Sequence, residues 1–107
     1  MINITVFKEG EFYTGVRIKG HANYAESGED IVCAAVSVLA INALNSIETL
    51  TKDKFEENVS ERQGFIEFKL IGAISPSAEV LMLSLVLGLQ SVAAENKKYI
   101  TLTLEEV

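Results

Sequence analysis

The sequence predicts an α+β domain in which two helices pack on one face of a mostly antiparallel sheet of about five strands. Three observations lead to this prediction. Short segments with alternating apolar and polar residues come in pairs, two long apolar segments lack that alternation, and the chain reads strand, strand, helix, strand, strand, helix, strand (ββαββαβ). With 107 residues, 49% of them hydrophobic, we expect one domain, residues 1–107.

The expected strands share period-two alternation and are separated by glycine-containing or polar connections. They are residues 2–8, 12–19, 55–60, 65–70 and 99–104. Glu9-Gly10-Glu11 suits a short hairpin connection between the first two, and the third and fourth form a second hairpin.

Residues 30–50 contain neither glycine nor proline and are too many for a buried strand, so they predict a helix with Asp30 as its N-cap. A second helix is expected to begin at Pro76, with Ser75 as N-cap, because proline is favoured at the first helical position. Gly88 lies in its leucine-rich part and indicates tight helix packing.

The single histidine and the single cysteine, His21 and Cys33, lie twelve positions apart across a polar, glycine-containing segment. If Asp30 caps the helix, Cys33 lies in its first turn, where free N–H groups and the helix dipole favour a thiolate. The N–H groups of Val32 and Cys33 are then candidates for an oxyanion hole. Spacing alone leaves a plainer interpretation open, in which Cys33 is a buried apolar residue and His21 makes local hydrogen bonds.

The sequence contains two blocks of interest: Gly20-His21-Ala22, and then Gly28, Asp30 and Val32-Cys33-Ala34-Ala35-Val36-Ser37. Together these blocks resemble the paired signature of the ribosomal-processing cysteine protease family, Prp. The likeness covers essentially the whole chain. It implies a bacterial cytoplasmic homodimer that removes the N-terminal extension of large-subunit ribosomal protein number twenty-seven. It also implies that His21 is the catalytic base and Cys33 the nucleophile, with Asp30 and Ser37 as further motif residues.

The supporting residues each have two interpretations. Asp30 can cap the helix or orient His21, and capping is favoured because a carboxylate near Cys33 would oppose thiolate formation. Ser37 lies one helical turn after Cys33 and can hold the thiolate or the preceding loop, or can bond back to the Cys33 carbonyl.

Residues 23–29 predict a mobile loop that closes on substrate and excludes water. In this interpretation Tyr24 packs on the substrate, Ser27 and Gly28 form the hinge, and Gly20 allows a turn or a close backbone approach next to His21. The alternative is that Tyr24 packs permanently on the core.

Charge and composition argue against several function classes. The chain has 15 acidic and 9 basic residues, a net charge of −6, which disfavours direct nucleic-acid binding and suits a basic protein substrate, although ordinary solubility explains it equally well. One histidine and one cysteine are too few for a zinc site, and no phosphate-binding motif occurs, so we expect no metal and no cofactor.

A single cysteine excludes an intrachain disulfide and favours the cytoplasm, and the uninterrupted apolar runs are shorter than the roughly 20 residues of a membrane span. We therefore expect no membrane partner. The alternative to an enzyme is a non-catalytic acidic protein that binds a ribosomal or other basic partner, with Cys33 buried in its core.

Overall fold

The computed structural model describes residues 1–20, 27–60 and 62–107, with the backbone alone for Ser27. The elements in these residues follow the predicted order: β1 (Ile2–Glu9), β2 (Phe12–Lys19), α1 (Ser27–Leu50), β3 (Lys54–Ser60), β4 (Phe65–Ile71), α2 (Pro76–Glu95) and β5 (Ile100–Glu106). The α+β prediction is confirmed, and both hairpins form where the alternation placed them.

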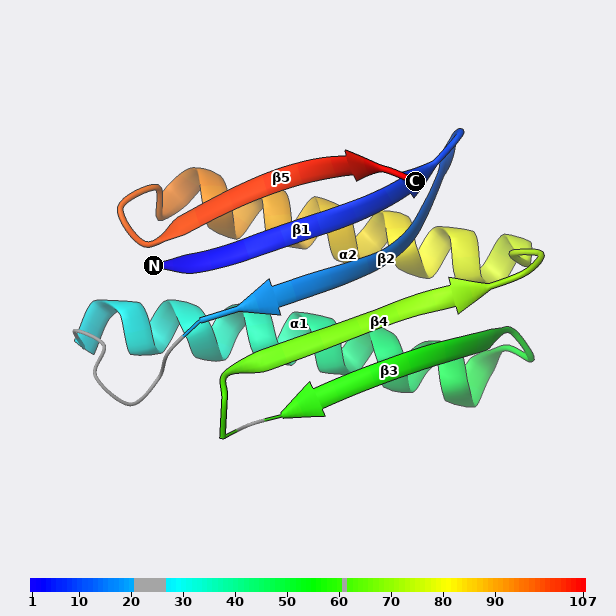
Figure 1. Cartoon of the computed structure of the whole chain (residues 1–107), viewed down its shortest axis with the longest axis horizontal. Coiled ribbons are helices and arrows are strands. Elements are labelled where there is room, and N and C mark those ends of the chain that lie inside the picture. Colours follow the sequence, from blue (N-terminus) through cyan, green and yellow to red (C-terminus); the bar gives the residue numbers. More distant parts are fainter. Residues whose placement is uncertain (21–26, 61) are drawn as a thin grey trace.

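The five strands form one sheet in the order β3-β4-β2-β1-β5. The pairs β1–β2, β2–β4 and β3–β4 are antiparallel, and β5 joins the edge of β1 in parallel. Both helices lie on the same side of the sheet, α2 across β1 and β2 and α1 toward β3 and β4 (Figure 1). The sheet is therefore mostly antiparallel, with its helices on one face, as the sequence predicts.

The core lies between the sheet and the two helices. Every second residue of β1 (Ile2, Ile4, Val6) and one face of each helix are buried in it. A Cβ atom on Gly88 of α2 would lie 3.3 Å from Cδ1 of Leu39 on α1, which confirms that Gly88 allows tight packing of the helices.

The start of α2 is also confirmed. The Ser75 hydroxyl oxygen accepts the Ala78 N–H at 3.1 Å, and Pro76 is the first helical residue. The start of α1 differs from the prediction, because the helix begins at Ser27 and Asp30 lies inside the first turn rather than at the N-cap. The residues from Ser27 to Glu29 include no proline, and two acidic residues in the first turn, Glu29 and Asp30, suit the helix dipole. The Glu29 carboxylate is 2.6 Å from the Met1 ammonium, which ties this turn to the N-terminus just before β1.

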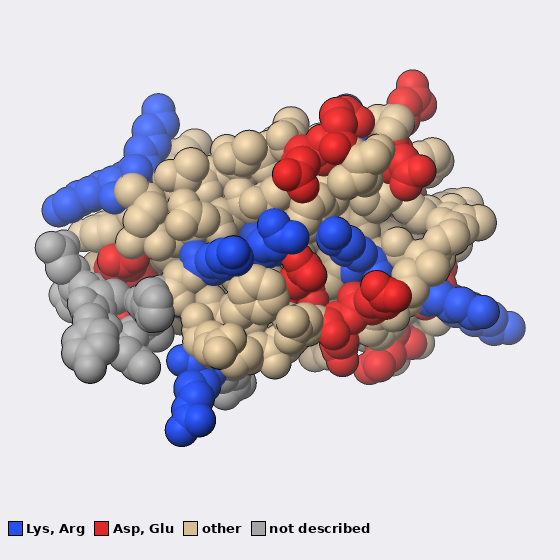
Figure 2. Space-filling model, in the orientation of Figure 1, with Lys and Arg blue, Asp and Glu red and all other residues tan. Residues whose placement is uncertain are grey.

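The sheet face opposite the helices is charged. On it the Phe7 ring, 1% exposed, lies beneath the Lys69 ammonium at 4.2 Å and the Arg17 guanidinium at 5.1 Å from the ring centre. Arg17 also pairs with Glu67 across β2 and β4 at 2.6 Å. Figure 2 shows this face, with Lys and Arg side chains across its middle and acidic side chains on either side.

Asp53 ties the loop after α1 to the start of α2 and gives stability a predictable pH dependence. Its carboxylate accepts the Ser75 N–H at 2.8 Å. The pKa of Asp53 is lowered from 3.8, chiefly because Ser75 hydrogen-bonds to the carboxylate through its side chain and its backbone, with a smaller effect from Thr51. Since the folded-state pKa is depressed, this stabilisation is present above pH 3.8 and is lost as the pH falls through the lower folded-state value.

We therefore expect Asp53→Asn to lower the unfolding free energy at pH 7 by less than about 1 kcal/mol, since the carboxylate is open to solvent. Urea unfolding between pH 7 and pH 2 should show the difference from the unsubstituted chain shrinking below pH 3.8. Glu48→Gln, at an exposed position of α1, is the control for loss of one carboxylate. A difference that stayed constant with pH would contradict the assignment.

Candidate active site

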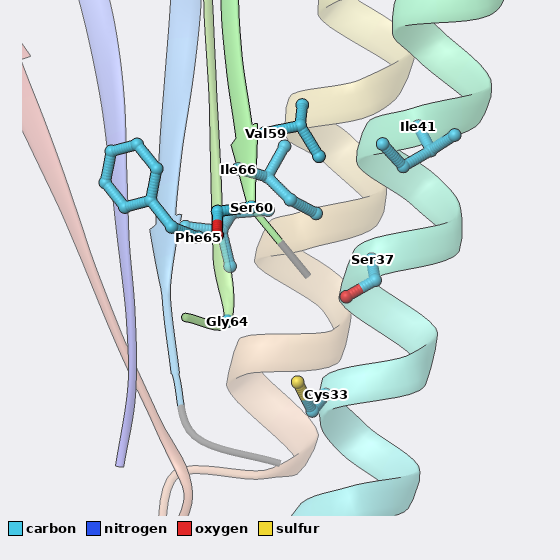
Figure 3. Close-up of a pocket in the computed structure, with 9 residues that line it drawn as sticks. Cys33, Ser37, Ile41, Val59, Ser60, Gly64, Phe65 and Ile66 are labelled. Carbon is cyan, nitrogen blue, oxygen red and sulfur yellow. The ribbon is translucent and has the colours of Figure 1, made fainter. Parts of the chain in front are cut away.

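Cys33 lies in the second turn of α1, and its half-buried side chain points toward the β3–β4 hairpin (Figure 3). A pocket of about 260 Å³ separates the helix from the hairpin at this point. The residues lining it come from β2, α1, β3 and β4: Ile18, Cys33, Ser37, Ile41, Val59, Ser60, Gly64, Phe65 and Ile66. The thiol therefore faces a cavity and is not enclosed in the core.

The pocket walls are mainly apolar. Ile41 comes from α1, Val59 from β3, and Phe65 and Ile66 from β4, and the polar side-chain atoms are those of Cys33, Ser37 and Ser60. Pockets that enclose drug-sized ligands measure roughly 300–1,000 Å³. A slightly smaller apolar pocket beside a thiol suits a single apolar side chain of a larger substrate.

Ser37 shares a helix face with Cys33, as its spacing predicts, and its hydroxyl points into the same pocket (Figure 3). Within the described residues this hydroxyl makes no hydrogen bond to the Cys33 carbonyl, so the back-bonded alternative does not hold. Its role toward the thiolate stays a prediction.

The early start of α1 changes the electrostatics expected at Cys33. With Ser27 as the first helical residue, Cys33 is the seventh, and the N–H groups of Val32 and Cys33 face the carbonyls four residues earlier. The prediction that these two N–H groups form an oxyanion hole is therefore wrong. The effect of the helix dipole also declines beyond the first turn, so activation of the thiol depends on another group.

His21 and Tyr24 lie outside the described residues. The orientation of His21 by Asp30 therefore stays a prediction. The residue before His21 is described. Gly20 follows β2 and donates its N–H to the carbonyl of Gly64 at 2.9 Å, and Gly64 lines the Cys33 pocket. A Cβ atom on Gly20 would lie 3.1 Å from Cγ1 of Ile2, so the position has little room for a side chain. The close approach of a substrate backbone at Gly20 stays a prediction.

Ser27 and Gly28 are helical, so the loop predicted at residues 23–29 is wrong for its last three residues. A Cβ atom on Gly28 would lie 2.7 Å from the Tyr99 hydroxyl, so glycine lets the Tyr99 ring cover the first turn of α1. This long-range contact gives Gly28 a packing role. Its predicted role as a hinge, like that of Ser27, stays a prediction.

Sequence reasoning missed the pocket walls. The position of Ile41 could have been predicted, because Cys33, Ser37 and Ile41 are spaced four apart and share one helix face. The positions of Val59 and Phe65 could not, since they depend on the order of the strands in the sheet. In the parts of the chain that the structure describes, no group of three or more His, Cys, Asp or Glu residues is arranged to hold a metal ion.

Comparison with known proteins identifies relatives along nearly the whole chain. The family model described as "Cysteine protease Prp" matches residues 1–101. The ribosomal processing cysteine protease Prp of Staphylococcus aureus is 30% identical over 101 residues, which is 94% of each chain. Its counterpart in Bacillus subtilis is 27% identical over 88 residues, covering 78% of this chain and 79% of that one.

The fold matches solved structures as well. A crystal structure of the S. aureus Prp protease in complex with a substrate peptide has a TM-score of 0.89 at 24% sequence identity. The match covers 98% of this chain and 100% of that one. The similarity therefore extends to the arrangement of all the strands and helices.

Proposed function

The chain belongs to the cysteine protease Prp family, and we propose that His21 and Cys33 form the catalytic dyad with which it removes the N-terminal extension of large-subunit ribosomal protein twenty-seven. The observation that carries this proposal is the position of Cys33. Its sulfur faces an apolar pocket, and the chain leaves β2 toward His21 at Gly20, which is hydrogen-bonded to the pocket residue Gly64.

The reaction is acyl transfer in two stages. His21 takes the proton of the Cys33 thiol, and the sulfur attacks the carbonyl carbon of the peptide bond. Protonated His21 then gives its proton to the leaving amine, so that the C–N bond breaks and a thioester remains. Water, deprotonated by His21, attacks the thioester, which releases the extension as an acid and restores the thiol.

The pocket supports selection of an apolar side chain next to the cleaved bond. Apolar groups from three strands and α1 surround the space in front of the sulfur, and burying such a side chain there removes apolar surface from water. A basic side chain would lose hydration in the same place without gaining a partner. Substrate segments with an apolar residue at the cleavage point fit this site.

The alternative of a non-catalytic acidic binding protein with a buried structural cysteine has less support. Cys33 is half-buried at a cavity wall, and the relatives along nearly the whole chain are cysteine proteases. The acidic surface serves either function, since a ribosomal-protein substrate is basic. We place the activity in the cytoplasm, where ribosomal proteins are assembled.

Incubation with the extended ribosomal protein tests the proposal directly. The purified chain should shorten that protein at one bond, and the mass of both products identifies the bond. The protein pretreated with a thiol-alkylating reagent should leave it intact, and the already trimmed protein should not change. Cleavage that survives alkylation of Cys33, or an absence of cleavage by the untreated chain, would contradict the proposed activity.

We also propose that two copies associate through the outer faces of the helices. Large apolar side chains are exposed there, among them Ile31 at 72%, Val38 at 67% and Leu87 at 67%. The opposite sheet face is charged (Figure 2), which makes it the poorer interface. By length and composition both helices would also suit a membrane span, yet both pack against the sheet.

Light scattering of the purified protein should give the mass of two chains. Val38→Glu places a charge on the proposed interface and should reduce the measured mass to that of one chain.

A further inference from the structure

The β3 strand is an edge of the sheet, and its end lies at the active-site pocket. Among the described residues, β3 has β4 on one side and no strand on the other. Residues from Glu56 to Val59 are exposed, and Val59 and Ser60 line the Cys33 pocket. An exposed edge of this kind presents unpaired backbone N–H and C=O groups to a further strand.

The register shows which backbone groups are free. Gly20 and Gly64 continue the antiparallel pairing of β2 with β4, and the 2.9 Å bond between them makes this a hydrogen-bonded pair. Since such pairs alternate with non-bonded ones, every second residue of β4, including Glu67, turns its N–H and C=O toward β3 instead. Glu57 and Val59 alternate along β3 with the residues that bond to β4. Their backbone N–H and C=O groups therefore point to the open edge.

The side chains of Glu57 and Val59 face the helices. Val59 pairs with Ile66 and Glu57 with Phe68, and both partners are buried on the helix side of the sheet. Glu57 is thus about 7 Å along the strand from the pocket residue Val59, on the same face. Among the described residues its carboxylate forms no ion pair.

We propose that an extended segment of the substrate binds as an added strand along the free edge of β3, with an apolar side chain in the Cys33 pocket and a basic side chain beside Glu57. The inference rests on the proposed peptidase activity and adds how the substrate is held. Backbone hydrogen bonds to Glu57 and Val59 give affinity, and alternate side chains give selectivity. The charge of Glu57 complements the basic ribosomal protein, as does the net charge of −6.

Two charge variants test the side-chain contact, with a synthetic peptide that spans the junction between the extension and the mature N-terminus as the probe. Glu57→Lys and Glu56→Lys change the net charge equally. Glu56 lies opposite Lys69 in the strand register, however, so its side chain is on the other face of the sheet. We expect kcat/KM to fall about tenfold for Glu57→Lys and less than twofold for Glu56→Lys, in line with an interaction energy of about 1.4 kcal/mol. Equal losses in the two variants would overturn the proposal.

A second pair of variants tests the backbone contact. Glu57→Pro removes the outward N–H, and Glu57→Ala keeps it. Proline is tolerated on an edge strand where its nitrogen faces solvent. We expect a further loss of about tenfold in kcat/KM for the proline variant, with unchanged alkylation of Cys33 by a small reagent as evidence of an intact site. Equal kcat/KM for the two variants would exclude the added strand. If the proline variant unfolds, the comparison of Glu57→Lys with Glu56→Lys tests the proposal instead.

The outcomes separate this inference from the proposed function. If the unsubstituted chain cleaves the peptide and the Glu57 variants cleave it equally well, the binding mode is wrong and the peptidase activity stands. If the unsubstituted chain cleaves neither the peptide nor the extended protein, the proposed activity itself is wrong.

Discussion

Replacing Cys33 by alanine is expected to abolish cleavage of the extended ribosomal protein while leaving the fold in place. The exchange removes one sulfur atom from a half-buried position at a cavity wall, so the unfolding free energy should change by less than about 1.5 kcal/mol. Without the sulfur no thioester forms, so the first stage of the proposed reaction cannot take place. Product masses and thermal unfolding of the same sample measure both effects. Residual cleavage at the same bond would exclude Cys33 as the nucleophile.

His21→Ala should abolish turnover as well, and it has a second readout. If His21 takes the proton from Cys33, its loss slows alkylation of Cys33 by a small reagent at neutral pH, because less thiolate is present. The early start of α1 strengthens this expectation, since Cys33 lies beyond the first turn and gains little from the helix dipole. Alkylation at an unchanged rate would mean that the two side chains do not interact.

The strands were predictable from the sequence because one sheet face is buried. Alternation sets which residues face the core, and it placed β2 at residues 12–19, as the structure has it. The start of α2 was predictable from local chemistry, since Ser75 and Pro76 suit adjacent positions at a helix start. Each of these signals lies within a few residues of the feature that it predicts.

The start of α1 was not predictable in the same way. Asp30 suits an N-cap and also suits the first turn of a helix, so its residue type leaves two positions open. The choice depends on contacts with distant residues, namely Gly28 with Tyr99 and Glu29 with Met1. The expected oxyanion hole was wrong for the same reason, because it depended on where the helix begins.

The site itself was predictable in part. The sequence identified Cys33 and Ser37 on one helix face, and the structure brings both to one pocket. The opposite wall comes from β3 and β4, more than 20 residues further along the chain. Which of their residues reach the pocket depends on strand order and register, and the local sequence pattern predicts neither of these. The free edge of β3 follows from the same strand order.

Filling the pocket should separate substrate binding from thiol chemistry. Ser37→Leu places a larger apolar side chain on the helix face that carries Cys33, where it occupies space meant for the substrate side chain. Because a poorly accommodated side chain costs about 1–3 kcal/mol, we expect kcat/KM for the junction peptide to fall about tenfold or more. Alkylation of Cys33 by a small reagent should change by less than about threefold, since a small reagent does not need the whole pocket.

Two controls make this result specific. Ser37→Ala removes the hydroxyl without filling the pocket, and it should retain most of the activity unless the hydroxyl holds the thiolate. Ser84→Leu makes the same exchange at an exposed position of α2 and should leave kcat/KM unchanged. If Ser37→Leu cleaves the peptide as well as the unsubstituted chain does, the substrate side chain binds elsewhere. Equal losses in Ser37→Ala and Ser37→Leu would instead assign the effect to the hydroxyl, and Ser37 would then act on the thiolate rather than on the shape of the pocket.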